Sequence, residues 1–155
     1  LHPANTLSLH DALPIWTPFQ WNNKKNAGFT DGTPWIKINP NYKYVNAQSQ
    51  LEDENSIFNY YKKLIKLRKN NEIIVYGKYV LILGDNKDIY AYTREFKNET
   101  LLVICNFCEN IAKFVLPNNI RYERKDLIIS NYIVETECID EINLKPYEAR
   151  VYLLK

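Results

Sequence analysis

From residue 73 to the C-terminus, the chain consists of short apolar runs, each about as long as one β-strand. Turn-forming residues separate these runs, as in Gly84-Asp85-Asn86 and Pro117-Asn118-Asn119. Regularly spaced short strands joined by tight turns are typical of antiparallel sheets that close into a sandwich or barrel. We therefore expect residues 73–155 to form an all-β antiparallel domain of the β-sandwich type. The expected strands are 79–83, 89–95, 101–106, 113–116, 127–130 and 149–154.

A different periodicity precedes this region. Between residues 51 and 71, apolar side chains recur at helical spacing, which predicts one amphipathic helix with Asp53 as its N-cap. The basic residues of KKLIKLRK fall on the face opposite the apolar stripe, so we expect a solvated surface and not a nucleic-acid site. The apolar stripe consists of Ile57, Phe58, Tyr61, Leu64, Ile65 and Leu67.

Residues 16–50 show neither helical nor strand periodicity and are rich in Trp, Asn, Gly, Pro and Tyr. A structured loop of this length is usually functional. Four aromatic residues lie close together in it: Trp16, Trp21, Phe29 and Trp35. Two interpretations stay open, because such rings either anchor a loop to its scaffold or form a wall on which a sugar ring stacks.

Composition excludes several classes of partner. The 155 residues carry 20 basic and 18 acidic side chains, a balance that predicts neither nucleic-acid binding nor attraction to an anionic membrane. No apolar run approaches the roughly 20 residues that a membrane-spanning helix needs. The odd cysteine count predicts a reducing, cytoplasmic location. Cys105 and Cys108 form a CxxC without a second ligand pair, so we expect buried thiols, with no metal and no cofactor.

The stretch TPFQWNNKKNAGFTDGTPWIKINPNY, residues 17–42, resembles a signature of the α-amylase family of glycoside hydrolases. Within that family it is most similar to oligo-1,6-glucosidases, with α-glucosidases and trehalose-6-phosphate hydrolases beside them. The likeness continues through SIFNYYKKLIKLRKNNEIIVYGKY (56–79), IYAYTRE (89–95), LLVICNF (101–107), LIISNY (127–132) and LKPYEARVYLLK (144–155).

The resemblance implies a fold for each part of the chain. Residues 16–72 would be the end of a catalytic (β/α)8 barrel, comprising its last loop and its final helix. Residues 73–155 would be the C-terminal β domain. Because one loop and one helix cannot close a barrel, we expect 73–155 to fold alone and 1–72 not to.

The first residues do not fit this family. Residues 6–15, TLSLHDALPI, resemble the translation of a sequencing adapter, so we expect residues 1–15 to be an artefactual leader. His10 and Asp11 are then not a catalytic pair, although they are adjacent.

The resemblance also bears on the site. A retaining glycosidase needs two carboxyl groups about 5 Å apart, and in this family they come from barrel strands that precede the segment. We therefore assign no catalytic residue and no metal ligand within the chain. The candidates on the substrate side of the loop are Gln20, Trp21 and Asn26.

Three positions depart from the family pattern. Trp16 stands where the family has an Arg that contacts the terminal glucose, and one indole N–H cannot replace a guanidinium. Phe19 replaces a Met, which nearly conserves volume. Asn22 replaces an Asp and removes a charge that could have formed an ion pair there.

The leading functional hypothesis is therefore a C-terminal fragment of an oligo-1,6-glucosidase or α-glucosidase. The parent would hydrolyse α-glucosidic bonds in short glucose oligosaccharides by a retaining mechanism, and the fragment itself would be inactive. One alternative is a fragment of a trehalose-6-phosphate hydrolase; another is a non-catalytic β module that binds glycan or protein. The sequence leaves the oligomeric state open.

The β-module alternative makes a geometric prediction. A sugar platform would need exposed, coplanar rings, whereas buried rings would indicate a structural sheet. The candidate rings are Tyr79, Tyr90, Tyr92 and Tyr152.

Overall fold

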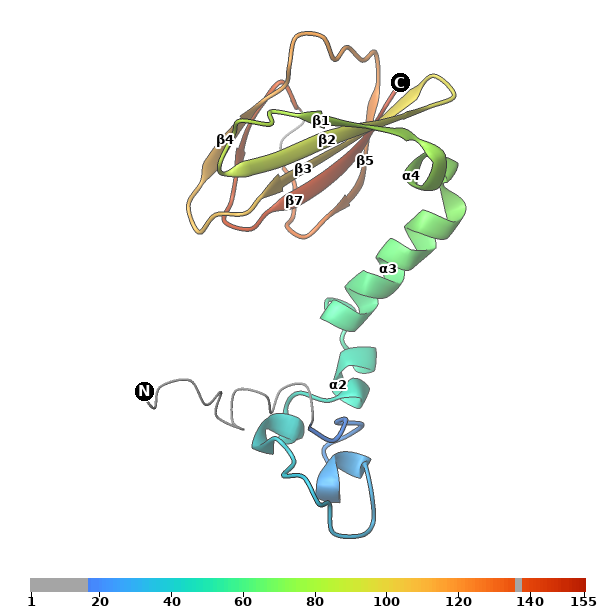
Figure 1. Cartoon of the computed structure of the whole chain (residues 1–155), viewed down its shortest axis with the longest axis vertical. Coiled ribbons are helices and arrows are strands. Elements are labelled where there is room, and N and C mark those ends of the chain that lie inside the picture. The colour runs from blue at the N-terminus through green and yellow to red at the C-terminus, as the bar shows by residue number, and fades with distance from the viewer. Residues whose placement is uncertain (1–16, 136–137) are drawn as a thin grey trace, which may run out of the picture. The chain divides into compact units, whose positions relative to one another are not determined.

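A computed structural model describes residues 17–135 and 138–155. The expected leader, with His10 and Asp11, lies outside the described residues, as does Trp16. The chain divides into two compact units, Leu1–Lys66 and Leu67–Lys155, called unit 1 and unit 2 below. Figure 1 traces the elements of both units along the chain.

The described part of unit 1 contains little regular structure before its helices. Two 3₁₀ turns, η1 (Lys25–Gly28) and η2 (Pro40–Lys43), interrupt an otherwise irregular chain. Helix α2 (Ala47–Glu52) follows, and its first turn is closed by a capping box between Asn46 and Ser49. The Asn46 side chain accepts a hydrogen bond from the Ser49 N–H at 2.9 Å.

The single helix predicted over residues 51–71 is wrong, because the chain breaks between α2 and α3 (Ile57–Asn70). Asp53 has extended φ/ψ angles of −94° and 111° and ends α2, so it is not an N-cap. Ser56 takes that role, since its hydroxyl accepts from the Asn59 N–H at 3.2 Å. The Asn59 amide in turn donates to the carbonyls of Gln50 and Asp53, which holds the corner.

Unit 2 is an antiparallel β-sandwich, as predicted. One sheet has five strands in the order β1-β2-β3-β7-β5, and the other pairs β4 with β6. The strands are β1 (Lys78–Ile82), β2 (Ile89–Phe96), β3 (Glu99–Asn106), β4 (Ala112–Val115), β5 (Lys125–Ser130), β6 (Glu141–Leu144) and β7 (Ala149–Leu154). All six predicted strands are present, five with shifted ends and β7 with its predicted limits, and the prediction missed β6, in which only Ile142 and Leu144 are apolar.

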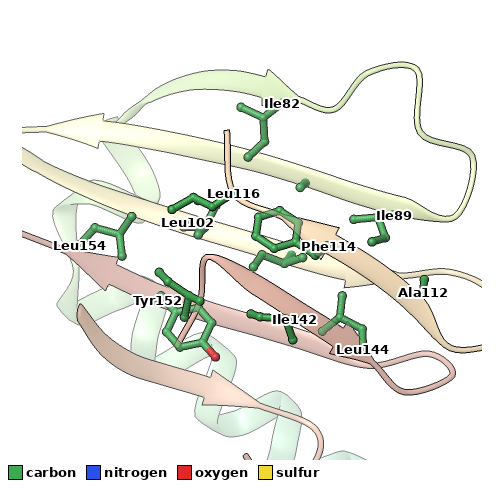
Figure 2. Packing of buried hydrophobic residues seen from close by; sticks show 13 residues of the cluster. Ile82, Ile89, Leu102, Ala112, Phe114, Leu116, Ile142, Leu144, Tyr152 and Leu154 are labelled. Atoms are coloured by element: carbon green, nitrogen blue, oxygen red, sulfur yellow. The ribbon is translucent and has the colours of Figure 1, made fainter. Parts of the chain in front are cut away.

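The main core lies between the two sheets. Phe114 of β4 is fully buried, and Figure 2 shows it among side chains from the larger sheet and from β6. Strand β7 alternates strictly, with Arg150, Tyr152 and Leu154 pointing inward, whereas β3 is buried on both faces. In β2, Ile89 and Ala91 are buried, as the predicted alternation requires.

The outer face of the large sheet carries a second, smaller cluster. Ile73, from the short helix α4 (Glu72–Tyr76), packs there with Leu101 and Val103 of β3. The sequence prediction placed the β region directly after residue 72 and missed α4. Gly77 joins α4 to β1, and a Cβ at this position would lie 2.4 Å from the Ile73 carbonyl oxygen, so only glycine fits. Among the described residues, no helix has the length and apolarity needed to cross a bilayer.

Candidate substrate-side loop

The main chain around Trp21 is clamped from two sides. Its N–H donates to the Ala27 carbonyl at 2.9 Å, and its carbonyl accepts from the Gln48 N–H at 3.0 Å. The Gln20 carbonyl accepts from the Ala47 N–H at 2.8 Å. The first N–H groups of a helix have no acceptor within the helix. The loop carbonyls therefore serve as acceptors for the first N–H groups of α2, and the same hydrogen bonds fix the position of the loop.

The Gln20 side chain ties two loop segments together. Its amide Nε2 donates to Asn41 Oδ1 at 3.0 Å and also to the Val45 carbonyl. Both amide hydrogens therefore serve the fold of the loop. The structure thus places the Gln20 amide in an internal tie.

Asn26 holds a neighbouring turn. Its amide donates to the Thr30 carbonyl at 2.9 Å and to the Gly32 carbonyl at 2.7 Å. Asn26, Ala27 and Gly28 have φ values of 55°, 56° and 69°, which makes three consecutive residues in the left-handed region. For Ala27 this conformation is unfavourable, so the surrounding hydrogen bonds must maintain it.

Asn22, which replaces the Asp of the family pattern, packs directly against this turn. A Cβ on Gly28 would lie 2.4 Å from Asn22 Nδ2, so Gly28 is required by close approach as well as by its φ. Asn22 Oδ1 accepts from the Lys24 N–H at 3.0 Å. An amide oxygen therefore supplies the acceptor that a carboxylate would supply here.

The aromatic side chains of the loop are exposed. Trp21 and Phe19 contact each other edge to face with ring centroids 4.6 Å apart. Trp35 is 92% exposed, so it anchors nothing within unit 1. The scaffold-anchor interpretation therefore fails for Trp35, and the described part of unit 1 buries only two apolar residues, Pro18 and Ala27.

An open groove of about 870 Å³ runs along this loop and the following helices. Gln20 and Trp21 line it, whereas Asn26 does not. Its exposed apolar lining consists of Phe19, Trp21, Val45, Leu51, Ile57 and Phe58. No carboxylate lines the groove.

The ionisable groups of the described residues offer no catalytic pair in this groove. The carboxylates of unit 1 between residues 17 and 66 are all exposed: Asp31, Glu52, Asp53 and Glu54. Across residues 17–135 and 138–155, no three His, Cys, Asp or Glu side chains are grouped so that they could hold a metal ion.

The strand tyrosines of unit 2 do not form a flat platform. Tyr152 is buried in the main core, and Tyr79 and Tyr90 are about half exposed. The Tyr79 and Tyr92 rings are inclined by 40°, and the Tyr90 and Tyr92 rings by 57°. A hydrogen bond of 2.8 Å joins the Tyr79 and Tyr90 hydroxyls, and it raises the pKa of Tyr79. These angles and burials indicate a structural sheet.

A buried ion pair in unit 2 was not predicted. Arg150 Nε donates to Glu148 Oε1 at 2.7 Å, and both side chains are almost completely buried. Glu148 Oε2 also accepts from the Lys145 N–H at 2.7 Å. Burial lowers the pKa of Arg150, but the hydrogen bonds that it donates to Glu148 and Tyr152, together with their charges, raise its pKa overall. Strand alternation could have revealed this pair, because Arg150 shares the inward face with Tyr152.

The cysteines are free thiols in three different environments. Cys105 is half-buried in the second cluster, and burial raises its pKa. Cys108 Sγ donates to Asp88 Oδ1 at 3.2 Å, which raises the pKa of Cys108. Cys138 is exposed, whereas Cys105 and Cys108, for which we expected buried thiols, are only partly buried.

The chain therefore joins an incomplete loop-and-helix unit to a β-sandwich, and two family descriptions match these parts in the same order. "Alpha amylase, catalytic domain" matches residues 10–77, and "Alpha-amylase SusG C-terminal domain" matches residues 89–151. The protein is thus a partial α-amylase catalytic domain followed by a C-terminal β domain.

Individual relatives agree with this class. The chain is 58% identical over 140 residues to an oligo-1,6-glucosidase of Parageobacillus thermoglucosidasius, covering 90% of this chain and 25% of that relative. It is 41% identical over 140 residues to a trehalose-6-phosphate hydrolase of Bacillus subtilis, covering 89% of this chain and 25% of that protein. The chain belongs to the α-amylase family of glycoside hydrolases.

Solved structures show the same relationship. The crystal structure of Bacillus licheniformis trehalose-6-phosphate hydrolase matches with a TM-score of 0.84 and 47% identity, covering 90% of this chain and 26% of that chain. Isomaltulose synthase from Klebsiella sp. LX3 matches with a TM-score of 0.79 and 41% identity, covering 90% and 25%. The chain thus spans about a quarter of the length of the proteins it matches.

Proposed function

We propose that this chain supplies the C-terminal part of an oligo-1,6-glucosidase, which hydrolyses α-1,6 bonds in short glucose oligosaccharides. The observation that carries the proposal is the 58% identity to an oligo-1,6-glucosidase over 140 residues. Two further oligo-1,6-glucosidases match at 53% and 49% identity. The trehalose-6-phosphate hydrolases of Bacillus subtilis and Escherichia coli match at 41% and 39%.

In the complete enzyme, two carboxyl groups would lie about 5 Å apart, one as nucleophile and one as acid and base. Protonation of the leaving sugar and attack by the nucleophile give a glycosyl-enzyme, which water then hydrolyses. Among the described residues, none that lines the groove carries a carboxyl group. We therefore expect the 155-residue chain to have no hydrolytic activity on its own.

The loop residues would have different roles in that enzyme. Gln20 and Asn26 shape the loop, because their amides are engaged with backbone carbonyls or with Asn41. Trp21 is the candidate sugar contact, because its ring is 55% exposed and lines the groove. The C–H face of a glucose ring packs well on an indole.

A trehalose-6-phosphate hydrolase is the second candidate. It is favoured by the structural match to the Bacillus licheniformis enzyme, with a TM-score of 0.84. For both candidates we propose a cytoplasmic location. All three cysteines are free thiols, as is usual in a reducing compartment.

A fused enzyme separates the two candidates. We would join residues 17–155 to the three quarters of the Parageobacillus thermoglucosidasius enzyme that lie outside the matched segment. Glucose release from isomaltose, maltose and trehalose-6-phosphate is then measured, with the 155-residue chain alone as control. Isomaltose should be the best substrate and the chain alone should be inactive. Preferential cleavage of trehalose-6-phosphate would replace the first candidate by the second.

A further inference from the structure

Helix α3 presents an apolar stripe that nothing in unit 1 covers. No residue of α3 is buried, although its apolar side chains follow helical spacing. Ile57 is 82% exposed and Tyr61 is 63% exposed. An amphipathic helix gains its stability mainly from packing of its apolar face, so this stripe requires a partner.

The stripe continues into the groove. Ile57 and Phe58 belong both to α3 and to the groove lining, where Leu51 of α2 joins them. Leu64 and Ile65 extend the surface by two further turns of the helix. Contiguous exposed apolar surfaces of this kind mark interaction sites.

The comparisons indicate what kind of polypeptide would cover the apolar stripe of α3. Residues 10–77 match an α-amylase catalytic domain, yet the relatives are about four times as long as the matched segment. The surface therefore lies on the part of the chain that matches the catalytic domain, and not on the β domain. In layered α/β folds, the apolar stripe of a helix packs on the sheet of the same domain.

We propose that the surface formed by Leu51, Ile57, Phe58, Tyr61, Leu64 and Ile65 binds the remaining part of an α-amylase catalytic domain, also when that part is supplied as a separate polypeptide. Phe19 and Trp21 line the same groove, but we exclude them from this surface because we assign them to the substrate side. The inference deepens the proposed function, because association would complete the unit that carries the carboxyl pair.

Co-expression tests the proposal. The 155-residue chain is expressed with a tagged polypeptide containing the three quarters of the Parageobacillus thermoglucosidasius enzyme outside the matched segment. Capture of the chain on the tag measures docking, and isomaltose hydrolysis measures function. The relative's own matched segment of 140 residues serves as the positive control.

Two variants locate the surface. Phe58→Lys places a charge on the stripe and should reduce capture by about tenfold or more, because an unpaired charge is costly in an apolar interface. Lys66→Glu alters the opposite face of α3 and should leave capture within about twofold, since exposed charge changes are nearly neutral.

The outcomes separate docking from catalysis. Capture that Phe58→Lys abolishes, without isomaltose hydrolysis, supports the docking surface and counts against the proposed function. If the positive control is captured and the chain is not, or if Phe58→Lys leaves capture unchanged, the docking proposal is overturned. Self-association of the chain that Phe58→Lys disrupts, without capture, would also overturn it in favour of a second copy.

If neither this chain nor the relative's own segment is captured, the fused enzyme that contains residues 17–155 provides the test. Docking predicts that hydrogen exchange across α3 slows by about 100-fold in the fusion, relative to the isolated chain, and that Phe58→Lys reverses this protection. Unchanged exchange across α3 in the fusion would refute the docking surface.

Discussion

Unit 2 and unit 1 differ in where their apolar side chains lie. Unit 2 buries 13 residues in its main core, from Ile82 to Leu154, and adds a second cluster around Ile73. The described part of unit 1 buries only two apolar residues, Pro18 and Ala27, although many backbone hydrogen bonds hold its loop. Hydrogen bonds define a conformation, but burial supplies most of the free energy that maintains it. We therefore expect unit 2 to fold alone and unit 1 not to.

The largest expected effect comes from the centre of the main core. Phe114→Ala should lower the free energy of unfolding of unit 2 by about 3–5 kcal/mol, because the side chain is fully buried. Phe58→Ala, its counterpart in unit 1, should change it by less than about 0.5 kcal/mol. Urea unfolding followed by far-UV circular dichroism measures both, since the three tryptophans all precede residue 36 and do not report on unit 2. Equal losses from the two variants would remove the distinction between the units.

Breaking the buried ion pair between Glu148 and Arg150 should lower the free energy of unfolding of unit 2 by a similar or smaller amount. Arg150→Met leaves Glu148 buried without its charged partner and should cost about 3–5 kcal/mol. Lys113→Met breaks the exposed pair with Glu141 and should cost less than about 1 kcal/mol. The same urea titration compares them, and a neutral Arg150→Met would mean that the pair contributes nothing to the stability of unit 2.

A smaller effect is expected where α4 meets β1. Gly77→Ala forces a Cβ to within 2.4 Å of the Ile73 carbonyl oxygen and should cost about 1–3 kcal/mol. Gly84→Ala is the matched control, because its Cβ would meet only Leu81 Cδ2 at an ordinary 3.5 Å. The contrast should appear as a lower urea midpoint for Gly77→Ala alone. Equal midpoints would show that α4 can detach from the sheet without cost.

The smallest effect concerns a thiol in unit 2. The hydrogen bond to Asp88 raises the pKa of Cys108, so this thiol should become reactive at higher pH than an ordinary cysteine. Any stability from the protonated thiol is present below the unfolded-state pKa and is lost as pH rises through the folded-state pKa.

Alkylation rates at Cys108, followed by mass spectrometry across pH, test this shift. Asp88→Asn should move the midpoint to lower pH by removing the neighbouring negative charge. Asp85→Asn, in the preceding turn, should leave it in place. A midpoint that Asp88→Asn does not move would show that Asp88 does not control this thiol.

The sequence predicted the sandwich well because its strands alternate and its turns carry recognisable residues. Strand β7 was predicted with its observed limits, whereas β6 was missed because only Ile142 and Leu144 of its residues are apolar. The break before α3 was also missed, because Asp53 resembles an N-cap and the Asn59 amide that holds the corner has no sequence signature. Both β6 and the corner before α3 depend on contacts between residues that no sequence periodicity connects, so a prediction from patterns misses them.

The loop was less predictable than the sheet. Gln20, Trp21 and Asn26 were singled out from the family resemblance, and their contacts depend on backbone carbonyls that only the folded loop brings together. The left-handed conformation of Ala27 could not be predicted, because alanine carries no preference for it. What the sequence did predict correctly is the amphipathic character of α3.

Amide hydrogen exchange on the isolated 155-residue chain tests the contrast between the units most directly. If unit 2 folds alone and unit 1 does not, amides of β3 and β7 should exchange at rates set by global unfolding, while those of residues 57–66 in α3 exchange almost as fast as an unfolded peptide. Protection across these α3 residues equal to that of β3 would contradict the account, because it would show that the uncovered stripe is stable without the rest of a catalytic domain.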